Sequence, residues 1–283
     1  MTLPSPLILD SLLRDWLLED IGRGDRTTEC IFGGVNAPRG QAHWLLKEEG
    51  VIAGLPIAQR VFSLLDEQMS FESFITEGDK TPINTKIWEM EGKMSALLTG
   101  ERVALNLVMH LSGIATMARR YVEAIADYPT QLVDTRKTTP GLRILEKYAS
   151  VVGGAMNHRM GLDDAVMIKD NHIQAVGSIQ KAVTLIRQNM PYPLTIEVET
   201  TCIEEVQEAI ASGANIIMLD NMSIENMKEA VKLIRQENDL IKIEASGNVT
   251  LDNIEKIAST GIDYISTSAT ITRSPWLDIS MRF

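Results

Sequence analysis

The chain has 283 residues, a formal net charge of -11 at pH 7 and 45% hydrophobic residues. This length allows one large α/β barrel or two modest domains with a sizeable core, and the composition is that of a globular protein. The acidic balance argues against general nucleic-acid binding, which needs a broad basic surface.

Two cysteines are present, Cys30 and Cys202, without a CxxC spacing. We therefore expect neither a disulfide framework nor a zinc cluster. The first twenty residues set Asp10, Arg14 and Asp15 among apolar residues, which predicts an amphipathic helix and not a signal peptide. No apolar run approaches membrane-spanning length, so we expect a cytoplasmic protein that binds no membrane.

The first hundred residues predict a small α+β domain. Apolar spacing predicts an opening helix that ends near residues 19–21 and another helix over 56–65. β-like runs between turn signals predict strands at 41–47, 51–53, 70–76 and 83–90. From residue 95 the pattern is helical, and two helices fit it, with Ser112-Gly113 loosening the chain between or within them.

Two residues of this helical stretch stand out. Arg102 follows Glu101 beside an apolar stripe, where local pattern alone favours an exposed arginine or a pair with Glu101. His110 is interpreted as a structural histidine, and the sequence offers no partner for it.

From residue 131 onward, short β-branched runs alternate with amphipathic helices. The predicted strands are 131–133, 165–168, 194–198, 215–219, 241–245 and 264–265. The predicted helices are 141–149, 178–189, 203–212, 224–237 and 251–259. Most of the later units are roughly 20 to 30 residues long, which suits βα units joined by right-handed crossovers.

Nearly every predicted strand of this half is followed by polar residues. They are Asp134-Thr135-Arg136-Lys137, Lys169, Glu199, Asp220, Ser246-Gly247 and Ser266-Thr267-Ser268. In a barrel of parallel strands these ends converge on one face, where active sites lie. Asp220 or Ser246 alone could equally be a helix N-cap, but the full set favours an enzyme site.

Cations gather between Val133 and Ile173 although the protein is acidic. Arg143 and Lys147 fit an exposed basic face of a helix. Arg136-Lys137 and Lys169 instead follow strands, and His158-Arg159 follows a glycine pair. Basic residues at such places predict a binding site for an anion.

The remaining strand ends predict what such a site could bind. Glu199 and Asp220 could hold Mg²⁺ or accept hydrogen bonds from ribose hydroxyls. Ser246-Gly247 is interpreted as a phosphate seat at a helix N-terminus. The sequence contains no P-loop, no GxGxxG motif and no recognisable nucleophilic triad, which argues against ATP hydrolysis, a Rossmann cofactor and covalent acyl transfer. A local site for a small anionic ligand fits best.

Several segments together resemble one enzyme family. They are EDIGRGDRTT, ERVALN, DTRKTTPGLR, GGAMNHRMGLDD, IKDNHI, EVE, LDN and EASGN. This combination resembles the quinolinate phosphoribosyltransferases, also called carboxylating nicotinate-nucleotide pyrophosphorylases, over nearly the whole chain. The resemblance implies phosphoribosyl transfer from phosphoribosyl pyrophosphate to quinolinate with decarboxylation, which gives nicotinate mononucleotide, pyrophosphate and CO₂ in NAD biosynthesis.

The resemblance also implies an architecture. We expect an N-terminal α/β sandwich over residues 1–112 and an irregular, incomplete α/β barrel over 113–269, with the tail 270–283 returning to the first domain. The family forms a dimer, or a higher oligomer, in which one subunit covers the barrel mouth of the other. Arg102 matches an arginine that the family donates across this interface.

Site roles follow residue by residue from the same resemblance. Arg136, His158, Arg159 and Lys169 would bind the quinolinate carboxylates, and Arg102 would contact substrate from the partner subunit. The cations for quinolinate and for pyrophosphate are not separable from the sequence. Lys137, Lys169, Glu199 and Asp220 would carry the chemistry, and Glu199 and Asp220 would face the ribose and Mg²⁺. The other expected substrate contacts are Thr135, Ser246, Gly247, Asn248, Ser266 and Ser268. No prosthetic group is needed.

The sequence departs from the family at two places. Asn248 stands where many members have glycine, a variant that we expect to be tolerated. Ser268 and Thr270 stand where the family usually has glycine and leucine, so Ser268 could narrow the seat for the 5′-phosphate. Two alternatives stay open. One is a non-catalytic relative that keeps the anion pocket, although retention of the full set of site residues argues against it. The other is the related protein associated with molybdate transport, although the intact TRK and KDNH segments favour the quinolinate enzyme.

Overall fold

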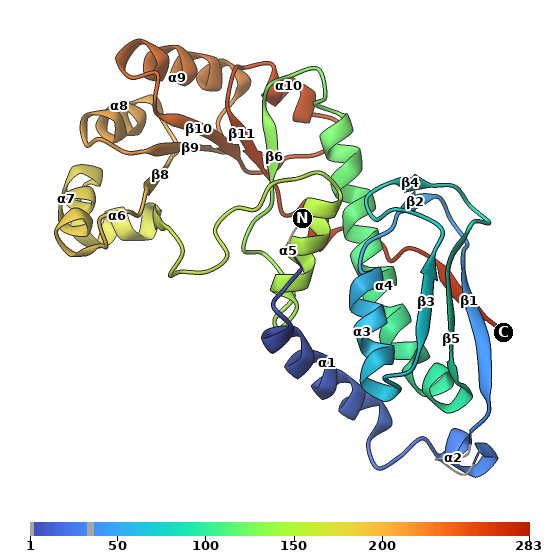
Figure 1. Cartoon of the computed structure of the whole chain (residues 1–283). Helices are drawn as coiled ribbons and strands as arrows, with labels where there is room; N and C mark the ends of the chain where they lie inside the picture. Colours follow the sequence, from blue (N-terminus) through green and yellow to red (C-terminus); the bar gives the residue numbers. More distant parts are fainter. Residues whose placement is uncertain (1–2, 33–36) are drawn as a thin grey trace. The chain divides into compact units, whose positions relative to one another are not determined.

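The computed structural model describes residues 3–32 and 37–283, which fold into two compact units. The first unit comprises Met1–Arg119, Ile144–Gly154 and Ser274–Phe283, and the second comprises Arg120–Arg143 and Ala155–Arg273. An antiparallel sheet organises the first unit and a parallel sheet the second (Figure 1). The predicted α/β fold class is confirmed.

The first unit is built on a four-stranded sheet in the order β12-β1-β5-β3. Its strands are β1 (Arg39–Leu46), β3 (Ser70–Ser73), β5 (Lys86–Lys93) and β12 (Ile279–Arg282), and β2 (Gly50–Val51) pairs separately with β4 (Lys80–Thr81). Burial alternates along β1 and β5, as expected for strands with one face on a core. This face contributes Trp44 and Trp88, whose rings pack edge to face around Phe62.

The helices of this unit are α1 (Pro6–Ile21), α2 (Arg26–Phe32), α3 (Leu55–Leu65), most of α4 (Met94–Glu123) and most of α5 (Arg143–Val152). The short helix α2 was not predicted. Its first turn is held by Asp25, whose carboxylate accepts a hydrogen bond from the Thr28 N–H at 3.0 Å.

Helix α4 is one continuous helix, so the prediction of two helices is wrong. Ser112 and Gly113 have packing roles that do not require a break. The Ser112 hydroxyl accepts a hydrogen bond from the Ala53 N–H at 3.0 Å. A Cβ on Gly113 would lie 1.9 Å from the carbonyl oxygen of Pro275, so glycine permits the chain near the C-terminus to pass against α4.

Helix α5 was predicted as a helix of the barrel, yet most of it belongs to the first unit. Lys147 is fully buried there, so the prediction of an exposed basic face is wrong for this residue. Its neighbour Glu146 is also fully buried and lies 2.9 Å from Nε2 of His110. His110 is thus a structural histidine with a carboxylate partner on α5.

The second unit contains a parallel sheet in the order β6-β11-β10-β9-β8-β7. Its strands are β6 (Gln131–Val133), β7 (Val166–Ile168), β8 (Ile196–Thr200), β9 (Ile216–Asp220), β10 (Lys242–Ser246) and β11 (Tyr264–Ser266). Its helices are α6 (Asp170–Val176), α7 (Ile179–Asn189), α8 (Ile203–Ala211), α9 (Ile224–Glu237), α10 (Ile254–Ala258) and α11 (Ala269–Thr272). Figure 1 shows α7, α8 and α9 along the outer side of this sheet.

The sheet curves without closing. In the described residues the edge strands β6 and β7 are not paired with each other. Met156, at the start of the segment that leads to β7, makes an isolated parallel bridge with Val133 of β6. This arrangement is an incomplete barrel, as the resemblance implied.

All six strands predicted from residue 131 onward are present, with ends shifted by no more than two residues. Helices α6 and α11 were not predicted, because each is short and begins directly after a polar strand end. Helix α10 begins at Ile254, although its predicted start was residue 251. The loop between β10 and α10 is therefore longer than predicted.

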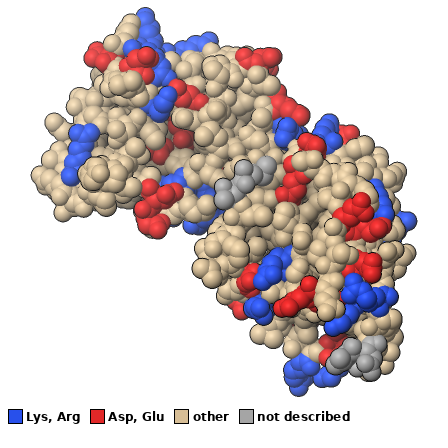
Figure 2. All heavy atoms as spheres, in the orientation of Figure 1, with Lys and Arg blue, Asp and Glu red and all other residues tan. Residues whose placement is uncertain are grey.

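No helix within the described parts of the chain combines the length and the apolar character needed to cross a membrane. On the face drawn in Figure 2, lysine and arginine side chains are interspersed with aspartate and glutamate, and no broad basic area is visible. This distribution agrees with the argument against general nucleic-acid binding.

Candidate active site

The carboxyl ends of the parallel strands in the second unit surround a cavity of about 590 Å³. The predicted site residues that line it are Thr135, Arg136, Lys137, His158, Arg159, Lys169, Glu199, Asp220, Ser246, Gly247, Asn248 and Ser266. They come from six strand ends and from the segment that crosses between β6 and β7. Only the tertiary fold brings these distant segments together, since residues 135 and 266 are far apart in the sequence.

Arg102 and Ser268 are the two predicted site residues that do not line this cavity. Arg102 lies on α4 in the first unit and is exposed. Ser268 is the N-cap residue of α11 and has φ of -84°, an ordinary value for an L-residue. The backbone at this position therefore does not require the glycine that is usual in the family.

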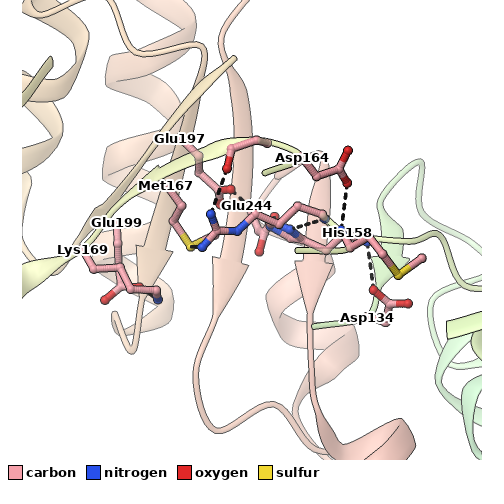
Figure 3. A network of polar contacts seen from close by, with 11 residues as sticks. Asp134, His158, Asp164, Met167, Lys169, Glu197, Glu199 and Glu244 are labelled. Atoms are coloured by element: carbon pink, nitrogen blue, oxygen red, sulfur yellow. Dashed lines mark hydrogen bonds and ion pairs between the residues drawn. The ribbon is translucent and has the colours of Figure 1, made fainter. Parts of the chain in front are cut away.

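The mouth of the cavity carries charges of both signs. Lys169 directly precedes α6, and its side chain forms an ion pair with Glu199 at the end of β8 (Figure 3). The Lys169 side chain is 43% exposed and that of Glu199 is 13% exposed. Arg136 contributes a buried Nε that has no hydrogen-bond partner among the described residues. The cavity thus offers cationic donors that are not all used within the protein.

Deeper in the barrel, His158 contacts two buried glutamates that the sequence analysis did not select. Its Nε2 lies 3.2 Å from Glu197 on β8 and 3.4 Å from Glu244 on β10. Figure 3 shows the imidazole directed toward both carboxylates. A period-two signal could have found them, because Glu197 and Glu199 lie on the same face of β8, as do Glu244 and Ser246 on β10.

Burial alone would lower the pKa of His158, but the hydrogen bonds to Glu197 and Glu244 outweigh it and raise that pKa to about 10. Burial raises the pKa of Glu197, and the negative charge of Glu244 raises it further. The Arg159 nitrogen lies 2.7 Å from Nδ1 of His158, and Nε2 faces the two carboxylates, so the ring is fixed at both of its nitrogens. With a pKa of about 10, His158 is protonated at neutral pH and carries a positive charge between the two buried glutamates.

The same histidine is fixed by the end of β6. Asp134 is buried and accepts a hydrogen bond from the His158 N–H at 2.9 Å. Arg159 then extends along the wall of the cavity, and its Nη1 donates to the carbonyl of Ala165 at 2.8 Å. Burial and the nearby Arg136 lower the pKa of Arg159. The Asn157–Arg159 segment is therefore a positioned loop that presents a guanidinium to the cavity.

The structure contradicts the prediction that Ser246-Gly247 lies at a helix N-terminus. Helix α10 begins six residues after Asn248, so these residues do not form a helix N-terminus. Gly247 and Asn248 instead have left-handed backbone, with φ of 94° and 49°. Asparagine adopts this conformation more readily than most residues, which explains why it can replace the glycine of many family members. Within residues 3–32 and 37–283, the N–H groups of Gly247 and Asn248 have no protein acceptor.

Asp220 and Ser246 are not helix caps. Helix α9 is capped by Ser223, whose hydroxyl accepts a hydrogen bond from the Asn226 N–H, and the N-cap residue of α10 is Asn253. Asp220 and Ser246 are therefore available to the cavity. This finding removes the capping alternative for both residues.

Two groups of residues could contact a metal ion. Ligand atoms of His158, Glu197 and Glu244 lie within 4.8 Å of one another, but Nε2 of His158 already donates to the two carboxylates. Glu199 and Asp220 both line the cavity mouth and supply oxygen atoms of the kind that Mg²⁺ prefers. Glu199 and Asp220 would supply two ligands to Mg²⁺, which usually takes its remaining ligands from water and phosphate oxygens.

Comparison with known proteins assigns the family. Residues 25–112 match the model of the quinolinate phosphoribosyl transferase N-terminal domain, and residues 114–282 match that of the C-terminal domain. The chain is 66% identical over 280 residues to a "Probable nicotinate-nucleotide pyrophosphorylase [carboxylating]" of Synechocystis sp., with 99% of this chain and 94% of that protein covered. A protein of the same name from Bacillus subtilis is 46% identical, covering 97% and 93%.

A solved structure gives the same result. The crystal structure of NadC from Streptococcus pyogenes superposes with a TM-score of 0.94 at 42% identity, covering 100% of this chain and 98% of that one. The chain belongs to the quinolinate phosphoribosyltransferase family.

Proposed function

We propose that this chain transfers a phosphoribosyl group from phosphoribosyl pyrophosphate to quinolinate and releases CO₂, which yields nicotinate mononucleotide for NAD biosynthesis. The main observation behind this proposal is the cavity at the strand ends. It is lined by cationic side chains that can bind two anionic substrates and by two carboxylates on neighbouring strands. Family membership at 66% identity over nearly the full chain supports the same reaction.

Quinolinate is assigned to the cationic side of the cavity. Arg136, Arg159 and Lys169 bind its two carboxylates, with Thr135 beside Arg136. His158 has both ring nitrogens engaged, so its contribution is to hold the Arg159 segment and the neighbouring carboxylates in place. Because the dicarboxylate is held in register, the ring nitrogen can approach the sugar in one orientation.

Phosphoribosyl pyrophosphate is assigned to the opposite strand ends. Ser246, Gly247 and Asn248 receive the 5′-phosphate, with support from Ser266 and Ser268. Among the described residues, no protein group accepts from the N–H groups of Gly247 and Asn248, which therefore suit an anion. Asp220 and Glu199 face the ribose hydroxyls, and Lys137 lies toward the pyrophosphate.

The reaction has two bond-breaking stages. The ring nitrogen of quinolinate forms a bond to the anomeric carbon as the bond from that carbon to pyrophosphate breaks, and positive charge develops on the ribose. Glu199 and Asp220 stabilise this charge, while Lys137 neutralises the leaving group. The C2 carboxylate then leaves as CO₂, and its electron pair stays on C2 beside the cationic ring nitrogen until a proton is added. No prosthetic group is needed as an electron sink.

We assign Mg²⁺ to the substrate pyrophosphate, with Glu199 and Asp220 as the protein groups that could hold it. When bound, the ion supplies charge neutralisation for the leaving group. A cytoplasmic location remains a prediction of the sequence.

The active assembly is proposed to be a homodimer, or a higher oligomer, in which Arg102 enters the site of the partner. Two features support this assembly. Arg102 is exposed on α4, and α1 exposes apolar side chains, with Leu7 91% and Leu18 66% accessible. Exposed apolar side chains of this kind are often covered in assemblies.

The function is tested by incubating the purified protein with quinolinate, phosphoribosyl pyrophosphate and Mg²⁺. Mass spectrometry should detect nicotinate mononucleotide only when both substrates are present. Quinolinate binding without product would favour the non-catalytic alternative, and turnover of a different acceptor would favour the relative associated with molybdate transport.

Lys169→Ala should lower kcat/KM for quinolinate about a hundredfold, because one charge-assisted contact to a developing or bound anion is lost. Stability should fall by less than about 1 kcal/mol, because the pair with Glu199 is partly exposed. Steady-state kinetics and thermal melts check both expectations, with Lys181→Ala on α7 as an exposed control. A loss of stability as large as the loss of activity would make Lys169 a structural residue.

Ser268→Gly should change KM for phosphoribosyl pyrophosphate by no more than about threefold, because φ at this position suits either residue. Initial rates at varied phosphoribosyl pyrophosphate and saturating quinolinate provide the measurement. Collapse of activity in this variant would mean that the Ser268 hydroxyl makes a contact that the substrate requires.

A further inference from the structure

The loops after β9 and β10 are joined by two asparagines in an uncommon conformation. Asn221 follows Asp220 and has φ of 54°, and Asn248 has φ of 49°. The N–H of Asn221 donates to the carbonyl of Ser246 at 2.9 Å, so the two loops leave the sheet side by side. Non-glycine residues with left-handed backbone are uncommon, and a pair of them at one cavity calls for a physical reason.

A chain of side-chain hydrogen bonds connects these loops. Nδ2 of Asn248 donates to Oδ1 of Asn221 at 3.0 Å, and Nδ2 of Asn221 donates to Oδ2 of Asp220 at 2.8 Å. Asn248 is held from the other side by Asn253, whose Nδ2 donates to its carbonyl at 3.0 Å. The amide of Asn221 therefore lies between the catalytic carboxylate candidate and the loop assigned to the phosphate.

Gly247 leaves the space that this connection needs. A Cβ on Gly247 would lie 2.2 Å from Oδ1 of Asn221 and 2.4 Å from its Cγ. Only a residue without a side chain allows the Asn221 amide to lie across the loop and reach Asn248. The left-handed φ of 94° at Gly247 demands glycine for the same reason.

We propose that Asn221 and Asn248 are positioning residues that hold Asp220 and the Ser246–Asn248 loop in one fixed relation, so that the ribose and the 5′-phosphate of phosphoribosyl pyrophosphate bind to a preformed site. This inference rests on the proposed function. Binding to a preformed site is more favourable, because less free energy is lost in ordering loops and carboxylates. The side-chain amide of Asn248, which the glycine of many family members lacks, strengthens this connection through its hydrogen bond to Asn221.

Asn248→Gly removes the amide and keeps the backbone conformation, because glycine adopts φ of 49° without strain. KM for phosphoribosyl pyrophosphate should rise about fivefold, the amount expected for one net hydrogen bond, while KM for quinolinate stays unchanged. Asn84→Gly is the matched control. Asn84 also has left-handed backbone, with φ of 64°, but it lies in the first unit and is exposed. This control should leave both constants unchanged.

A double-mutant cycle separates positioning from direct contact. If Asn248 acts through Asn221, the Asn221→Gly variant and the Asn221→Gly, Asn248→Gly double variant should have the same KM for phosphoribosyl pyrophosphate. Fully additive effects would mean that Asn248 contacts the substrate by itself, and the inference would be overturned. If the wild-type protein makes product and Asn248→Gly leaves KM for phosphoribosyl pyrophosphate unchanged, as Asn84→Gly should, the inference would also be overturned.

Failure of the proposed function has a different signature. In that case the wild-type chain yields no nicotinate mononucleotide from quinolinate and phosphoribosyl pyrophosphate. The inference can then still be tested by calorimetry, which measures the affinity of the same variants for phosphoribosyl pyrophosphate. A weaker affinity in Asn248→Gly supports it, and equal affinities overturn it.

Discussion

Arg102→Ala should lose turnover by about a thousandfold while the fold and the assembly persist, because in the proposed assembly its guanidinium makes a charge-assisted contact to an anionic substrate in the partner's site. Arg102 is exposed on α4, so its removal creates no cavity in the core. Steady-state kinetics measure the activity, and size-exclusion chromatography with light scattering measures the assembly. Arg120→Ala, near the C-terminal end of the same helix, is an exposed control that should keep full activity.

Mixing two inactive variants tests whether Arg102 acts in the partner subunit. When Arg102→Ala and Lys169→Ala chains exchange subunits, each mixed dimer has one site with both defects and one intact site. Random exchange should therefore restore roughly a quarter of wild-type activity, because half of the dimers are mixed and each has one working site. No recovery after proven subunit exchange would mean that Arg102 acts in its own subunit or not at all.

His158→Ala should destabilise the protein by about 3–5 kcal/mol, because it removes the shared donor from two buried carboxylates. The Glu197 and Glu244 side chains are each 4% exposed, so water cannot readily replace the imidazole. Urea denaturation followed by circular dichroism measures the loss. Glu197→Gln should cost less, because it removes one of the two like charges and keeps the shape of the side chain.

The same cluster should make stability depend on pH. The pKa of His158 is raised from its ordinary value of 6.5 to about 10, so the folded state holds a proton that the unfolded chain releases. This contribution is complete below about pH 6.5 and is lost as the pH rises toward 10, at up to about 1.4 kcal/mol per pH unit. His158→Gln should flatten this part of the stability profile. An unchanged profile would mean that folding does not raise the pKa of His158.

Local pattern was sufficient to predict much of the second unit. Short β-branched runs located β6 to β11 within two residues, and helical spacing located α9 with its observed bounds. The polar residues after these strands also predicted the cavity lining, because parallel strands present their carboxyl ends on one side of a sheet. Both inferences depend on interactions between residues that are close in the sequence or on a general rule of topology.

Other features depended on contacts between distant segments. Gly113 lies within the continuous helix α4 and leaves room for the chain at Pro275, and Lys147 is buried because α5 packs in the first unit. Neither contact leaves a periodic signal in the local sequence.

The sequence by itself therefore determined the α/β class, the strand ends that carry the chemistry and the family of the protein. Only the tertiary structure decided that His158 bridges Glu197 and Glu244, and that Asn221 connects Asp220 to Asn248. The physical reason is that hydrogen bonding and burial depend on which side chains converge in space. In a barrel of this kind, residues from several strands meet in one interior, whatever their separation along the chain.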